Sequence, residues 1–155
     1  MDYEVVTAGS GEVGALVRLC SALFREDAGT RDPCTEVGWP EAHGREHFSA
    51  MISSDDALCL IAACGGTSVG YLAGLIQRPT TVRPVRIAEV QSMYVETSSR
   101  GRGVGSALVS EFLSWAGNRR ADRVSVTAYA ANEEAMGFYS RLGFRPRSTT
   151  LEKPL

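Results

Sequence analysis

A segment rich in glycine and arginine is the part of the sequence whose residue types most clearly indicate chemistry. Residues 94–108 read YVETSSRGRGVGSAL, and three glycines alternate there: Gly101, Gly103 and Gly105. Glycines between a strand and a helix leave backbone N–H groups uncovered, and the helix N-terminus adds partial positive charge. Arg100 and Arg102 add two full positive charges. The segment therefore predicts a cradle for a phosphate-bearing ligand, and a tight turn is the simpler alternative.

The spacing of these glycines differs from two common nucleotide-binding motifs. A P-loop ends in Gly-Lys-Ser/Thr, whereas Gly105 is followed by Ser106 with no lysine between them. A dinucleotide-binding fingerprint has the spacing G-x-G-x-x-G, and Gly105 stands one residue too early for it. The phosphate ligand is therefore expected to be of another kind.

Two sequence blocks together resemble the GNAT superfamily of N-acyltransferases. The segment Arg100-x-x-Gly103-x-Gly105 resembles its acyl-CoA signature, Q/R-x-x-G-x-G/A. The block N-x-x-A-x-x-F-Y-x-x-L-G-F over residues 132–144 resembles its downstream motif. The resemblance implies one N-acetyltransferase domain over residues 1–155, with acetyl-CoA as co-substrate.

The same resemblance implies which residues bind acetyl-CoA. The pantetheine arm would pair with free backbone groups of Met93 and Val95, and N–H groups near Tyr94 would stabilise the oxyanion. Asn132 is carried over as a cofactor contact, although capping of the following helix explains it equally well. The pyrophosphate would lie on residues 100–106, namely Arg100, Gly101, Arg102, Gly103, Val104, Gly105 and Ser106.

Acyl transfer to an amine requires a base for the amine proton and an acid for the leaving thiolate. Tyr139 occupies the motif position of the family's usual general acid, and the alternative is a tyrosine buried in the core. Its ordinary pKa of about 10 keeps it protonated at neutral pH. Glu89 is the candidate base or else a solvated or salt-bridged carboxylate. Gln91 follows on the same face of the predicted strand and would orient the water or the acceptor.

The net charge of −2 is unevenly distributed along the chain. Residues 1–56 hold 11 acidic and 4 basic residues, whereas residues 57–155 hold 7 acidic and 12 basic residues. The family resemblance places the acceptor site in the acidic half, where Glu26 and Asp27 would attract a small cationic amine, polyamine-like or aminoglycoside-like. An ordinary solvated loop is the alternative. Trp39 is expected either to stack on the acceptor or to pack against the sheet edge.

The apolar patterns predict a single α/β domain that positions these residues. Helices are expected over residues 12–28, 40–52, 101–117 and 132–143. Strands are expected over residues 3–7, 58–64, 69–76, 85–95 and 122–128, with short strands after residue 144. This order predicts one mixed sheet with helices packed on it and a parallel strand pair joined by a helical crossover. The resemblance implies the GNAT fold, in which the sheet is mostly antiparallel, helices cover both faces and the central parallel pair is splayed at the acyl-CoA site.

Composition and cysteine usage exclude several other classes. The chain of 155 residues is 44% hydrophobic and 22% charged, which excludes a disordered protein. No apolar run approaches the roughly 20 residues of a membrane helix, and no secretory signal is evident, so a cytoplasmic protein is expected. No nucleic-acid or membrane partner is expected, and family habit suggests a homodimer. Four free thiols are expected at Cys20, Cys34, Cys59 and Cys64.

Three alternative functions remain open. One is an acetyltransferase acting on protein or peptide amines, and another is a non-catalytic CoA-binding sensor domain. The third is a zinc hydrolase, because residues 43–47 read HGREH and match the spacing H-x-x-E-H. A third ligand for zinc is not evident, so no metal site is predicted.

Overall fold

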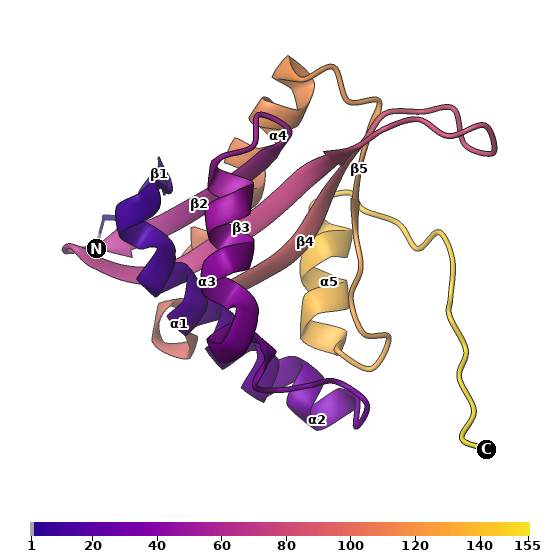
Figure 1. The fold of residues 1–155 in the computed structure, drawn as a ribbon, viewed down its shortest axis with the longest axis horizontal. Coiled ribbons are helices and arrows are strands. Elements are labelled where there is room, and N and C mark those ends of the chain that lie inside the picture. Colours follow the sequence, from indigo (N-terminus) through magenta and orange to yellow (C-terminus); the bar gives the residue numbers. More distant parts are fainter. Residues whose placement is uncertain (1) are drawn as a thin grey trace.

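Five strands form one sheet in the order β1-β2-β3-β4-β5 in the computed structural model, which describes residues 2–155 (Figure 1). Neighbouring strands pair antiparallel, except that β4 and β5 run parallel. The mixed, mostly antiparallel sheet is therefore confirmed. The strands are β1 Glu4–Thr7, β2 Ala57–Cys64, β3 Thr67–Gln77, β4 Ile87–Val95 and β5 Arg123–Val126.

Helices cover both faces of this sheet, as predicted. The helices α1 and α3 lie together on one face and α4 covers the other, while α5 follows β5 (Figure 1). Strand residues on both faces are apolar because both faces are buried. The longer helices are α1 Val13–Leu23, α3 Trp39–Ile52, α4 Val104–Asn118 and α5 Glu133–Arg141, and the short helical segments are η1 Ser10–Glu12, η2 Phe24–Ala28, α2 Gly29–Arg31 and η3 Thr97–Ser99.

The first helix continues beyond its predicted end before Gly29. A π-helical turn, η2, joins α1 to the short α2, and Gly29 has helical φ and ψ angles of −63° and −20°. The Thr30 hydroxyl donates to the carbonyls of Glu26 and Asp27, and Arg31 pairs with Asp27 at 2.7 Å. These local contacts outweigh the weak helix propensity of glycine.

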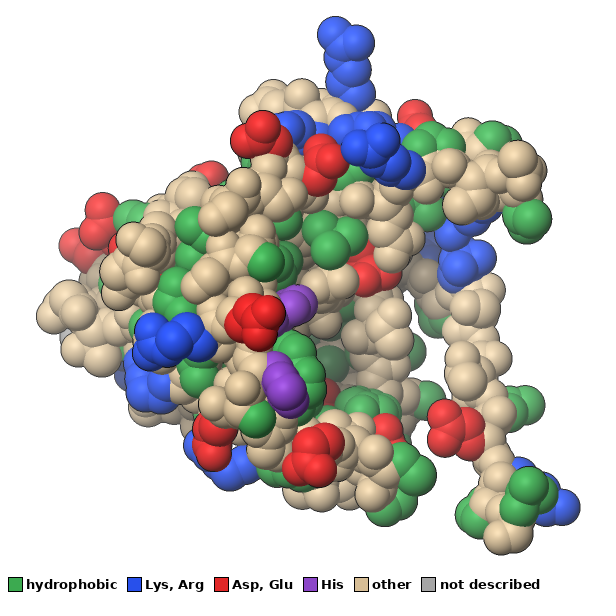
Figure 2. Space-filling model, in the orientation of Figure 1, with side chains coloured by type: hydrophobic (Ala, Val, Ile, Leu, Met, Phe, Trp, Pro, Cys, Tyr) green, Lys and Arg blue, Asp and Glu red, His purple; other side chains and the backbone are tan. Residues whose placement is uncertain are grey.

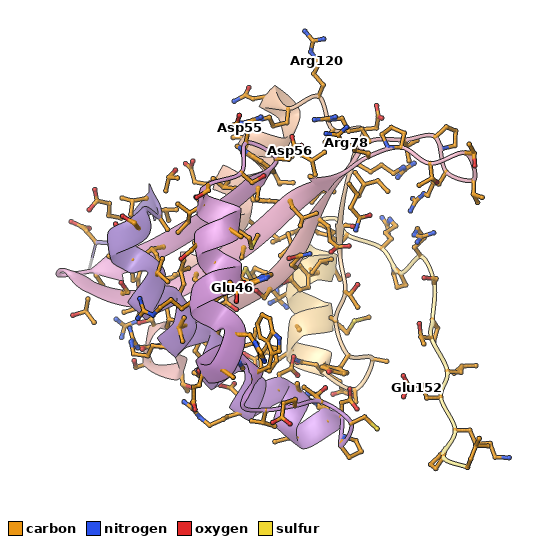
Figure 3. All side chains as sticks on the ribbon, viewed as in Figure 1. Glu46, Asp55, Asp56, Arg78, Arg120 and Glu152 are labelled. Carbon is orange, nitrogen blue, oxygen red and sulfur yellow. The ribbon has the colours of Figure 1, made fainter. Side chains whose placement is uncertain are left out.

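The strands predicted after residue 144 are absent. Residues 144–155 form no regular structure, and Glu152 lies on this extended tail well away from the body of the protein (Figure 3). Pro146 and Pro154 lack the N–H groups that a strand interior needs. Because no strand follows β5 in the sheet, the parallel pair lies at the sheet edge rather than at its centre.

A bulge interrupts the pairing of β3 with β4 beside the expected site. Gly74 is opposite Val90 and Ala73 is opposite Ser92, so Gln91 is an extra residue in β4. A bulge of this kind re-aims the side chains around it, and such bulges are frequent next to active sites.

The described residues contain neither a helix that could cross a membrane nor a group of side chains that could hold a metal ion. None of their helices combines the length and apolar character that a membrane span needs. No cluster of three or more His, Cys, Asp or Glu side chains among residues 2–155 is arranged to hold a metal ion. His43 and His47 instead contact the ring of Trp39, with centroids 6.2 and 5.1 Å away.

Candidate active site

A cleft of about 830 Å³ opens where β4 and β5 separate. The two strands pair only from Ile87 opposite Arg123 to Val90 opposite Val126. Beyond this point β4 continues to Val95 whereas β5 has ended, so residues 91–95 have one edge that β5 does not cover. The splayed parallel pair is therefore present. Figure 2 shows the surface hollowed between α3 and the α5 side of the molecule.

The predicted phosphate cradle lies at one end of this cleft. Gly101 and Gly103 have φ angles of +74° and +85°, which side-chain-bearing residues rarely adopt. Gly103 is the N-cap of α4 and no side chain caps the helix. The residues Gly103, Val104, Gly105 and Ser106 all line the cleft, and so does Gly101. The uncapped first turn of α4 thus presents backbone donors and a positive dipole end to a ligand.

Arg100 lies in the cradle and is already paired. Its Nη2 atom is 2.7 Å from the Glu26 Oε1 atom, and its Nε atom donates to the Val95 carbonyl at 2.8 Å. The Tyr94 hydroxyl donates to Glu26 Oε2 at 3.0 Å, and the guanidinium lies over the Tyr94 ring. Burial, and then the bond to Glu26, raises the pKa of Tyr94. Glu26 therefore lies at the glycine-turn end of the cleft, where it balances the positive charge of Arg100. Arg102 is exposed and is not among the residues that line the cleft.

Asp27, the next residue, joins the same turn to α5. Its Oδ1 atom accepts hydrogen bonds from Arg31 Nε at 2.7 Å and from Asn132 Nδ2 at 3.2 Å. Asn132 Oδ1 accepts from the backbone N–H of Ala135 at 3.0 Å, so Asn132 caps α5. Arg31 also donates to the Ala131 carbonyl. The turn η2 is thus hydrogen-bonded to both walls of the cleft.

Tyr139 lines the cleft from α5, where it is half-buried between the rings of Phe138 and Phe144. Burial, reinforced by the negative charge of Asp27, raises the pKa of Tyr139 to about 12. Its hydroxyl makes no hydrogen bond to another residue of the described part of the chain. The side chain is therefore a protonated donor that faces the cleft and is available to a ligand.

A second, smaller pocket of about 290 Å³ adjoins the cleft and contains Glu89 and Trp39. Four consecutive residues, 89–92, line it, which a regular strand cannot do because its side chains alternate between faces. The bulge at Gln91 explains this arrangement. Glu89 accepts a hydrogen bond from the Gln77 side-chain amide. The two pockets share five lining residues, Phe24, Val90, Gln91, Ser92 and Thr127.

The structure thus gathers most of the predicted residues into two adjoining spaces. Met93, Tyr94, Val95, Asn132 and Tyr139 line the main cleft. Sequence reasoning missed three side chains near them, Phe24, Arg31 and His47. For Arg31 the sequence does hold a signal, because an acidic and a basic residue at i and i+4, here Asp27 and Arg31, pair on a helix. For His47 the sequence pattern H-x-x-E-H indicates only a metal ligand.

Comparison with known proteins places this architecture in a family. The model of the acetyltransferase (GNAT) family matches residues 28–144. The N-alpha-acetyltransferase RimI of Mycobacterium tuberculosis is 31% identical over 148 residues, covering 93% of this chain and 81% of that protein. The chain spans about half the length, 46% and 56%, of two further curated relatives.

Solved structures show the same fold at low sequence identity. A mutant of the BH1408 protein from Bacillus halodurans has a TM-score of 0.89 at 18% identity, with 98% of this chain and 99% of that chain covered. A structure of the aminoglycoside N-acetyltransferase AAC(6')-Iy in complex with CoA has a TM-score of 0.78 at 16% identity, with 99% and 95% covered. The glycine cradle and most of the residues that line the cleft lie within the matched residues 28–144, and this match shows that the chain belongs to the acetyltransferase (GNAT) family.

Proposed function

We propose that this protein is an acetyl-CoA-dependent N-acetyltransferase that acetylates the primary amine of a small cationic acceptor. The observation that carries the proposal is the uncovered edge of β4, which runs directly into the left-handed glycine turn at the N-terminus of α4. Family membership and the CoA complex of a protein with the same fold support it.

The residues present fit acetyl-CoA as co-substrate. The backbone of Met93 and Val95 lies on the uncovered β4 edge and would pair with the pantetheine arm, near the Tyr94 N–H group. The N–H groups of residues 103–106, with Arg100, would hold the pyrophosphate. Asn132, Gly101 and Arg102 are proposed as further contacts. When bound, acetyl-CoA supplies an acetyl group activated as a thioester.

Each proton of the transfer has a proposed carrier. As the bond from the amine nitrogen to the acetyl carbon forms, Glu89 accepts the amine proton directly or through a water that Gln91 orients. N–H groups near Tyr94 stabilise the negative charge that develops on the carbonyl oxygen. Tyr139 donates its proton to the sulfur as the carbon–sulfur bond breaks. The products are the acetylated amine and CoA as a free thiol.

The proposed acceptor class rests on the acidic residues near the cleft and on the names of similar proteins. Asp27 and Trp39 are proposed to contact the acceptor, as is Glu26 from the cradle side. The sequence suggests polyamine-like or aminoglycoside-like acceptors, and AAC(6')-Iy is named for the latter. A second candidate is the N-terminal amine of a protein, favoured by the 31% identity to RimI over 148 residues. A cytoplasmic, dimeric protein remains a prediction.

Binding and turnover test the proposal separately. Calorimetry should detect acetyl-CoA at micromolar concentrations, and a panel of amines should release free CoA thiol in an amine-dependent manner. Binding without release from any amine would favour the sensor-domain alternative. The absence of binding would contradict the proposed function itself.

Replacing Glu26 with glutamine should strengthen acetyl-CoA binding. The change removes a negative charge from the cradle and releases Arg100 from its 2.7 Å ion pair. We expect the Kd for acetyl-CoA to fall about threefold to tenfold, because a single partly exposed charge contributes modestly to binding. The decrease in Kd should be smaller at high salt, which screens the charge. Glu41→Gln is the matched control, because Glu41 pairs with Arg25 and lines neither pocket. A weakened affinity in Glu26→Gln would show that Glu26 positions Arg100 for the ligand instead.

A further inference from the structure

We propose that the 290 Å³ pocket beside the β4 bulge binds the amine-bearing end of the acceptor and selects a primary amine on a narrow, apolar body, an alkylamine or arylalkylamine. This inference rests on the proposed acetyltransferase function and narrows its acceptor class. The pocket is called the aromatic pocket below. It is lined by Cys20, Phe24, Trp39, His47, Phe48, Glu89, Val90, Gln91, Ser92 and Thr127.

Ring contacts build the wall of the aromatic pocket. The ring of Trp39 stacks on Phe24 with centroids 5.9 Å apart and planes 16° apart. The rings of His47 and Trp39 have centroids 5.1 Å apart and planes 73° apart, and His47 in turn contacts Phe48, which is 1% exposed. Because Trp39 is held from two sides, its ring is a fixed surface for an apolar or aromatic body. Aromatic faces also attract an ammonium group.

Charge in the aromatic pocket suits one ammonium group. Among its lining residues, burial raises the pKa of the Cys20 thiol and lowers the pKa of His47, so both groups are neutral at neutral pH. Glu89 is left as the one negatively charged side chain among those that line the pocket. An acceptor with a single amine is therefore matched in charge, and a polycation is not.

The acidic residues near the aromatic pocket are committed to partners within the protein. Glu26 is paired with Arg100 and Asp27 with Arg31, each at 2.7 Å. The acid-rich loop thus offers less attraction to a polyamine than its sequence suggests, because these carboxylates are already neutralised by arginines. The number of acidic residues in the loop favours a polycationic acceptor, whereas their ion pairs with arginine argue against one.

The low polarity of the aromatic pocket disfavours a sugar ring there. A volume of about 290 Å³ is just below the roughly 300–1,000 Å³ range of small-molecule sites. The uncharged side chains that could meet hydroxyl groups are Gln91, Ser92 and Thr127, together with the ring nitrogens of Trp39 and His47. The several hydroxyls of an amino sugar would lose water without gaining partners, which is unfavourable. Shared lining residues connect the pocket to the main cleft, where the thioester is proposed to lie.

Steady-state kinetics at saturating acetyl-CoA test the selectivity. The acceptors are 2-phenylethylamine, n-hexylamine, spermidine, kanamycin and a tetrapeptide beginning with alanine. We expect kcat/KM to be at least about tenfold higher for 2-phenylethylamine and n-hexylamine than for the other three acceptors. A preference for spermidine, kanamycin or the peptide would overturn the inference while leaving the acetyltransferase function intact. Failure of all five, together with no acetyl-CoA binding, would instead contradict the proposed function.

Substitutions of Trp39 test whether the aromatic pocket determines the acceptor selectivity. Trp39→Leu should lower kcat/KM for 2-phenylethylamine by about tenfold or more, mainly through KM, and leave the Kd for acetyl-CoA unchanged. Trp39→Phe should restore most of the loss. Ser49→Ala is the matched control, because Ser49 is exposed on the same helix and does not line the pocket. A Trp39→Leu variant that folds, binds acetyl-CoA and retains its kcat/KM for 2-phenylethylamine would overturn the inference.

Discussion

Replacing Tyr139 with phenylalanine is expected to lower kcat by about 100-fold to 1,000-fold, which lies within the range that a positioned general acid contributes. The change removes the proton that the sulfur is proposed to receive. It leaves the ring between Phe138 and Phe144 in place, so the fold and the Kd for acetyl-CoA should be unaffected. Single-turnover thiol release, compared with calorimetric acetyl-CoA binding, measures the two effects separately.

The pH dependence of the same reaction gives an independent check on Tyr139. Its pKa of about 12 lies above the ordinary value, so the acid form persists throughout the neutral and mildly alkaline range. The rate should therefore not fall as pH rises through the ordinary tyrosine pKa of about 10. Tyr3→Phe is the control for the same chemical change, because the buried Tyr3 hydroxyl has no hydrogen-bond partner. An unchanged kcat in Tyr139→Phe would remove the proposed acid role.

Replacing Gly74 with alanine should destabilise the protein by about 3 kcal/mol, the upper end of the usual effect of overpacking. A Cβ atom at Gly74 would lie 2.5 Å from the Glu89 carbonyl oxygen and 2.5 Å from the Phe112 Cε2 atom. Neither neighbour can yield easily, because the carbonyl belongs to β4 and Phe112 is 0% exposed. Urea denaturation measures the change in the free energy of unfolding.

Gly117 provides the matched control for Gly74. A Cβ atom there would meet nothing within 4 Å, and Gly117 lies in the last turn of α4. Gly117→Ala should therefore stabilise the protein by up to about 1 kcal/mol through helix propensity. If Gly74→Ala unfolds at the same urea concentration as the unmodified protein, β4 is free to move away from β3, contrary to the close packing described above.

Local signals allowed much of the fold, including the glycine turn before α4 and the cap of α5, to be predicted. The strand-to-helix glycine turn at Gly103 and the α5 cap at Asn132 are each determined by a few neighbouring residues. Both followed from backbone chemistry that is readable in a short window of sequence. The family resemblance then related the two segments to each other in space.

Features that depend on distant contacts were not predictable. Glu26 pairs with Arg100 across 74 sequence positions, and Asn132 bonds Asp27 across 105. Acid-rich composition alone could not show that these carboxylates pair with the side chains of Arg100 and Arg31. The bulge at Gln91 was equally hidden, because a strand pattern reports which residues are apolar and not how they align with the next strand.

The π-helical turn η2 contacts both pockets and so connects them structurally. Three of its five residues make these contacts: Phe24 stacks on Trp39, Glu26 forms an ion pair with Arg100, and Asp27 accepts a hydrogen bond from Asn132. A polyanion that takes Arg100 from Glu26 also releases one anchor of the segment that holds the aromatic wall. Cofactor and acceptor affinities are then coupled, and linkage requires each ligand to change the affinity of the other by the same factor. Such a coupling through the turn would be measured as an equal change in the Kd of each ligand when the other ligand is bound.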